Sequence, residues 1–184
     1  MDCQKTPRVL FRLGLLLAVS IAVSLGGGQS LPWAAPAAAQ AATSARTFDP
    51  VAFFTGRTEG KGTLDEIASS PKTTHVTGSD SVRADGLFVI EQTVKIQGDP
   101  VKQRRWQLRQ TAPGRFSGTL SDATGPVTAV VTGNRMRIGY NMKGGMKVTQ
   151  VLTLAPDGRS LGNSMKIRKF GIVVATVAET IRKV

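Results

Sequence analysis

The sequence has almost none of the residues that usually build a catalytic or metal centre. Cys3 is the only cysteine and His75 the only histidine. Cys3 precedes the apolar run near the N-terminus, so a chain cleaved after that run keeps no thiol for a disulfide, a nucleophile or a metal cluster. A lone histidine on a weakly alternating strand is more often a surface residue than a catalytic base. We therefore expect no enzyme activity, no metal site and no cofactor.

Acidic residues are also scarce, because 12 Asp and Glu face 24 Lys and Arg, a net charge of +12. Such a charge usually suggests nucleic acid. The basic residues are spread along many predicted strands, however, and the chain carries an export signal, described next. We expect no nucleic-acid partner, weak contact with anionic components of the cell envelope, and a monomer.

No apolar run is long enough to span a membrane as a helix. The longest, Leu13–Leu25, falls short of the ~20 residues that a span needs and ends at three glycines. Basic residues precede it, and Ala-x-Ala steps follow between Pro36 and Ala42. These features are typical of a cleaved signal peptide. We predict a signal peptide at 1–41 and a periplasmic or secreted protein.

After cleavage, a short linker (42–52) and one domain (53–184) remain in this prediction. The domain alternates apolar and polar residues with a period of two, which is typical of half-buried strands. Tight-turn sequences such as Asp85-Gly86, Gly133-Asn134 and Asp157-Gly158 separate the strands. The first predicted strands are Phe53–Ile67, Thr73–Arg83, Leu87–Gln97, Val101–Thr111 and Arg115–Ser121.

The lengths of the turns, together with the requirement that the apolar residues share one face of the sheet, predict how these strands pair. A three-residue turn at Gly98–Pro100 sets Ile90 beside Leu108 and Gln92 beside Trp106, keeping one face apolar. The next turn sets Trp106 beside Leu120, and the turn at Asp157-Gly158 sets Leu154 beside Leu161.

The closing segment, Phe170–Val184, is rich in β-branched residues and favours a strand that pairs with the first one. A helical turn or two within 175–183 is the alternative. With that strand, the chain has about ten short antiparallel strands and no long helix. We predict an all-β fold, a closed up-and-down antiparallel β-barrel, because closure removes the exposed edges.

Several polar residues share the inner face with the apolar ones, namely Gln92, Arg104, Gln110, Gln150 and Asn163. A buried unpaired amide costs about 1–3 kcal/mol, which favours a cavity over a solid core. Placement at the barrel rim is the alternative. We predict that an interior ligand, a small apolar or amphipathic molecule, contacts Gln92, Arg104, Trp106, Tyr140, Met142 and Gln150. Arg104, as a lone interior cation, favours an acidic lipid, unless it reaches water at the mouth.

Short motifs resemble a known family. These are Phe53-Phe54-x-Gly-x-x-x-Gly-x-Gly, Arg105-Trp106 followed by Gly118-x-x-x-Asp122, and Lys169-Phe170-Gly171. They resemble domain of unknown function 3833, a bacterial envelope family. The resemblance implies a lipocalin-like barrel without an established activity. Members often carry a lipoprotein cysteine, and this chain has none after its apolar run.

Two other functions compete with ligand binding. A structural or adaptor barrel of the envelope would carry no ligand. An integral outer-membrane barrel would turn its apolar face to lipid, but Arg104 on that face would cost ~2–4 kcal/mol near the midplane.

Overall fold

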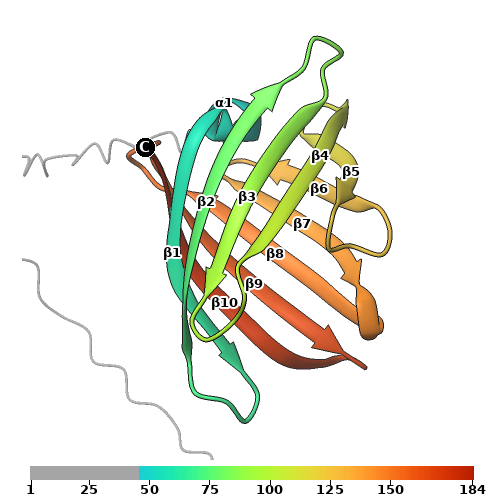
Figure 1. Cartoon of the computed structure of the whole chain (residues 1–184). Helices are drawn as coiled ribbons and strands as arrows, with labels where there is room; N and C mark the ends of the chain where they lie inside the picture. The colour runs from blue at the N-terminus through green and yellow to red at the C-terminus, as the bar shows by residue number, and fades with distance from the viewer. Residues whose placement is uncertain (1–45) are drawn as a thin grey trace, which may run out of the picture. The chain divides into compact units, whose positions relative to one another are not determined.

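The computed structural model describes residues 46–184, and the predicted signal peptide lies outside the described residues. Ten antiparallel strands form a closed barrel in which each pairs with its neighbours in the chain and β10 pairs with β1 (Figure 1). The elements are α1 (Pro50–Phe54), β1 (Gly56–Glu66), β2 (Lys72–Val82), β3 (Phe88–Ile96), β4 (Lys102–Ala112), β5 (Arg115–Leu120), β6 (Val127–Thr132), β7 (Arg135–Met142), η1 (Lys143–Gly145), β8 (Met146–Leu154), β9 (Ser160–Lys169) and β10 (Ile172–Lys183). The predicted barrel is confirmed, including the closing strand.

Alternation along the strands places the apolar residues inside, where they form one core. The predicted pairs Trp106–Leu120 and Leu154–Leu161 are confirmed. The pairing of β3 with β4 was predicted wrongly, since Ile90 lies beside Trp106 and Gln92 beside Arg104.

The β3–β4 error comes from the position of the turn. Asp99 N–H donates to Ile96 O (3.0 Å) and Gly98 has a φ of 80°, so the chain reverses before Pro100. The true pairing differs from the predicted one by two residues. Such a shift keeps every side chain on its predicted face, so the apolar pattern could not distinguish the two registers.

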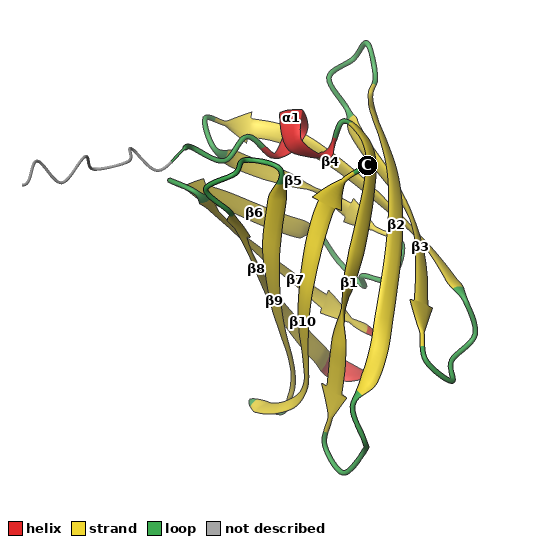
Figure 2. Cartoon of the chain, turned by 90° about the vertical axis from the view of Figure 1, so that its left-hand side faces the viewer, coloured by secondary structure: helices red, strands yellow, loops and turns green. Residues whose placement is uncertain are grey.

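The start of the first predicted strand was wrong, because Phe53 and Phe54 belong to the short helix α1. Asp49 caps this helix by accepting a hydrogen bond from Ala52 N–H (3.1 Å), and Pro50 occupies its first turn. The rings of Phe53 and Phe54 pack edge-to-face 5.1 Å apart, and both are buried with Phe48. The helix thus covers one end of the barrel, here called the helix end (Figure 2).

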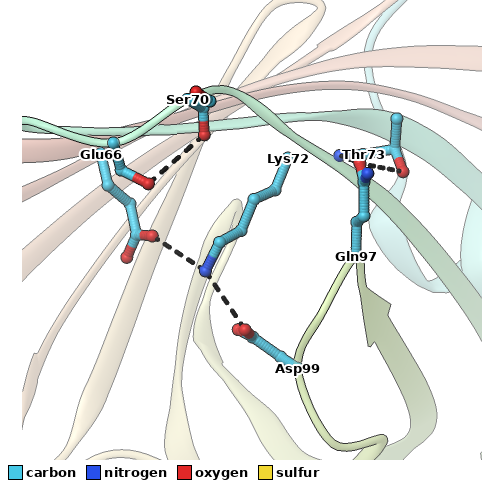
Figure 3. A network of polar contacts seen from close by, with 7 residues as sticks. Glu66, Ser70, Lys72, Thr73, Gln97 and Asp99 are labelled. Carbon is cyan, nitrogen blue, oxygen red and sulfur yellow. Dashed lines mark hydrogen bonds and ion pairs between the residues drawn. The ribbon is translucent and has the colours of Figure 1, made fainter.

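The opposite end, here called the rim, is formed by the β1–β2, β3–β4, β5–β6, β7–β8 and β9–β10 connections. At the rim, Lys72 Nζ lies 3.3 Å from Glu66 Oε2 and 3.1 Å from Asp99 Oδ1 (Figure 3). This cation therefore joins the first two of those connections. No helix within 46–184 is long and apolar enough to cross a membrane.

Candidate functional site

A chamber lies inside the barrel, lined by α1 and by strands from all round the wall. Its volume is about 70 Å³. For comparison, one water molecule needs about 10–15 Å³ of such a volume. Most of its wall is apolar and comes from alternate residues of the strands, with Phe54 of α1 at the helix end. The polar lining residues are Thr58, Gln92, Arg104, Gln150, Asn163 and Glu179. A chamber with this lining suits an apolar group with a polar end.

Trp106 forms the best-defined part of the apolar wall. Its side chain is 6 % exposed, and its ring meets Tyr140 edge-on with centroids 5.7 Å apart. Its indole Nε1–H donates to Gln92 Oε1 (2.8 Å), which satisfies the only polar atom of the ring. The hydrogen bond and the ring contact hold the indole in one orientation against the chamber.

Arg104 is not the lone cation that the sequence suggested. Its Nε donates to Asp122 Oδ2 at 2.6 Å, and the two side chains are 20 % and 24 % exposed. Asp122 lies just after β5, in the β5–β6 connection at the rim. Arg104 therefore enters the lining as one half of an ion pair, on the rim side of the chamber.

A second polar group faces the chamber from β8, β9 and β10, and we call Gln150, Asn163 and Glu179 the acceptor cluster. Asn163 Nδ2 donates to Glu179 Oε2 (2.9 Å). Within 46–184, no group donates to Gln150 Oε1, Asn163 Oδ1 or Glu179 Oε1, and all three oxygens are buried. Because the amide oxygen and nitrogen can exchange places by rotation, Glu179 is the firm acceptor here.

Burial shifts the acidity of this interior. Desolvation raises the pKa of the Glu179 carboxyl, and the hydrogen bond from Asn163 opposes that rise. Asp80, which shares the inner face of the sheet with Ile90, also has two buried oxygens without a donor among the described residues. Desolvation raises its pKa to about 7. The interior thus gains negative charge as the pH rises through neutrality.

The residues predicted to contact a ligand divide into two groups. Gln92, Arg104, Trp106 and Gln150 line the chamber. Tyr140 is buried behind Trp106, and Met142 lies half-buried where β7 ends, so neither belongs to the lining. Gln110, predicted on the inner face, is exposed at the helix end of β4.

Sequence reasoning missed Asp122 and Glu179 as site residues. Asp122 appears in the family-like motif, but it lies in a connection, where alternation gives no face. Glu179 has the same parity as Val177 and Ile181, and this signal could have placed it inside β10.

Residues of the kinds that serve in catalysis lie away from the chamber. His75 is on the outer face of β2, where its Nε2 lies 2.7 Å from Glu59 Oε1. The sequence Gly158-Arg159-Ser160-Leu161-Gly162 matches the pattern Gly-x-Ser-x-Gly. Here, however, it leads from a hairpin turn into β9 rather than from a strand into a helix, and Ser160 Oγ donates to Asp157 Oδ2 (2.8 Å).

Comparison with known proteins gives the family. A model of DUF3833, proteins of unknown function, matches residues 32–183. The chain belongs to the DUF3833 family. No curated protein is significantly similar in sequence.

Two solved structures share the fold of this DUF3833 barrel. An S-type phycobiliprotein lyase, CPES, from Guillardia theta has a TM-score of 0.56 and 7 % identity, covering 73 % of this chain and 90 % of its own. A protein of unknown function from the DUF3598 family of Nostoc punctiforme has a TM-score of 0.53 and 10 % identity over 77 % of this chain. The DUF3833 chain spans about half of the Nostoc protein, 51 % of its length. At these identities the likeness shows the lipocalin-like barrel alone.

Proposed function

We propose that the barrel binds a small amphipathic molecule, with a single slender apolar chain and a polar head that donates hydrogen bonds. The observation that carries the proposal is the acceptor cluster, which lies in the wall of a mainly apolar chamber and holds three buried oxygens without donors among the described residues. Buried acceptors without a donor cost free energy, about 1–3 kcal/mol each. An alcohol or ammonium head would supply the missing donors.

The acidic lipid expected from the sequence fits the chamber less well. A carboxylate head would have to share Arg104 with Asp122, whose Oδ2 already accepts from Arg104 Nε at 2.6 Å. It would also enter an interior that already holds Glu179 and Asp80, and like charges repel strongly where water is excluded. An ammonium head is attracted instead of repelled, because the negative charge of the Glu179 carboxylate stabilises it.

The size of the apolar chain sets the expected affinity. Each buried methylene contributes about 0.8 kcal/mol, so an octyl chain supplies about 6 kcal/mol before the cost of association. We therefore expect dissociation constants on the order of micromolar to millimolar for simple octyl compounds.

Isothermal titration with octylamine, octanol and octanoate tests the head group. We expect octylamine to bind about tenfold or more tightly than octanoate, the difference that one charge-assisted contact makes. Glu179→Gln should remove most of this preference. Octylamine should also bind more tightly at pH 8 than at pH 6, because Asp80 loses its proton through about 7.

The matched control for that titration is Glu91→Gln, which changes a carboxylate on the outer wall that pairs with Arg105. Its preference among the three compounds should equal that of the unchanged protein. If octanoate binds most tightly, the acceptor cluster does not select the head group. If none of the three binds saturably, a structural role without a ligand becomes the better reading.

We also propose that the protein is exported and acts as a monomer in the periplasm or outside the cell, as a binding protein rather than an enzyme. The support is the sequence pattern of residues 1–41, with its basic start, short apolar run and Ala-x-Ala steps. N-terminal sequencing of protein from an envelope fraction should find a start at Gln40 or Ala42. A chain that still begins at Met1 would contradict the export proposal.

A further inference from the structure

The rim exposes apolar side chains that the barrel does not need. Phe170 is 89 % exposed, Ile172 is 65 % exposed and Ile67 is 63 % exposed. They are neighbours, since the N–H of Ile67 donates to Val174 O (3.0 Å) just beyond Ile172 in β10. Large apolar side chains gathered at one exposed end are typical of an interaction surface.

The backbone at Phe170 is unusual for its residue type. Its φ is 51°, in the left-handed region that favours glycine, and Gly171 follows with a φ of 83°. A bulky residue held there is conformationally costly. The turn nevertheless keeps a phenyl ring at its tip, with Lys169 Nζ 5.7 Å from the ring centroid. An exposed aromatic beside a cation is the arrangement that a membrane interface favours.

The wall on the β7–β9 side of this tip is basic, and acidic residues are almost absent from its sequence. From 123 to 178 the only acidic residue is Asp157, which lies in the β8–β9 turn at the helix end. Near the rim, Lys147 of β8 lies directly opposite Arg168 of β9. Lys143 lies in the adjoining β7–β8 connection, and Lys169 is the last residue of β9.

These cations have no counter-charge in the described part of the chain. The ion pairs formed within 46–184 involve other cations, so Lys143, Lys147, Arg168 and Lys169 are unpaired there. Like charges directly opposite each other across two strands destabilise a sheet. An external anionic surface would remove that repulsion.

We propose that this surface, formed by Lys143, Lys147, Arg168, Lys169, Phe170 and Ile172 and here called the basic tip, docks on a bilayer that contains anionic lipids. Phe170 and Ile172 enter the headgroup region, while the four cations lie near the lipid phosphates. Nucleic acid fits the surface less well. The bases of a duplex are already stacked on one another, so Phe170 and Ile172 would stay exposed to water. The proposal does not depend on which ligand the chamber takes.

Vesicle co-sedimentation tests this proposal, with protein purified from cells that express the full chain. We expect binding to vesicles of phosphatidylcholine with phosphatidylglycerol, little binding to phosphatidylcholine alone, and release by high salt. Lys147→Gln with Arg168→Gln should weaken binding about tenfold or more, since each cation near an anionic surface contributes. Phe170→Ser should weaken it about fivefold without a change in net charge.

The matched control is Arg135→Gln with Arg182→Gln, which removes the same charge from the helix end of the outer wall. This variant should bind vesicles almost as well as the unchanged protein. Equal loss in both double variants would show a general charge effect and overturn a localised tip. Absence of binding to the phosphatidylglycerol vesicles would overturn the proposal, as would preferential binding of a DNA duplex through the same residues. The affinity of the basic-tip variants for octylamine should equal that of the unchanged protein. This result separates the vesicle test from the ligand proposal.

Discussion

Replacing Trp106 by alanine is expected to lower the free energy of unfolding by about 3–5 kcal/mol, because a large buried ring is lost and a cavity remains. The ring is buried against Tyr140, and its Nε1–H is paired with Gln92. The alanine variant also leaves the Gln92 carbonyl without that donor. Urea unfolding followed by far-ultraviolet circular dichroism measures the loss.

Arg105→Ala is the matched control, because it changes the next residue of β4 on the outer wall. Arg105 Nε lies 2.5 Å from Glu91 Oε1, and both side chains are exposed, so the pair contributes little. We expect a change within about 0.5 kcal/mol. A larger loss for Arg105→Ala than for Trp106→Ala would mean that the faces of β4 are assigned the wrong way round.

Gly118→Ala is expected to destabilise the barrel by about 3 kcal/mol or more, because the new methyl group collides with backbone rather than with a movable side chain. A Cβ at this position would overlap the carbonyl of Gln107, lying 2.8 Å from its carbon and 2.9 Å from Leu108 Cα. Strands β4 and β5 would have to separate where Gly118 faces Leu108. Expression yield and the urea midpoint of the variant measure the effect.

Gly162→Ala is the control for this substitution, since Gly162 also lies inside a strand. Nothing lies within 4 Å of a Cβ built there, and the position is exposed. Alanine in a strand is less costly than glycine by about 0.5–1 kcal/mol, so this variant should be equally or slightly more stable. A loss in both variants would point to strand propensity rather than to the close approach of β4 and β5.

The sequence predicted the barrel because its apolar and polar residues alternate with a period of two, as the side chains of a strand do. Alternation decides which face each residue occupies, and the turn residues decide where strands end. The register of β3 and β4 escaped this reasoning, because a shift by two residues leaves all faces unchanged. The helix α1 escaped it as well, since the adjacent aromatic residues Phe53 and Phe54 resemble the start of the strand that follows them.

The site was predictable only where its residues lie on strands. Gln92, Arg104, Trp106 and Gln150 were placed on the inner wall by parity, and the structure finds them in the chamber lining. The partner of Arg104 was not predictable, because Asp122 lies in a connection whose path depends on the closed barrel. That single ion pair changes the expected chemistry of the ligand head.

The position of the C-terminus has a practical consequence. The N–H of Phe48 donates to Gly133 O (2.9 Å), and the N–H of Val184 donates to Arg57 O (3.1 Å), so residues 48 and 184 both lie at the helix end. Figure 1 shows the C-terminus beside α1. A fluorescent protein or an immobilisation tag fused after Val184 would therefore stand on the far side of the barrel from Phe170. Such fusions suit surface-binding and imaging assays, because they leave the basic tip free to meet its target.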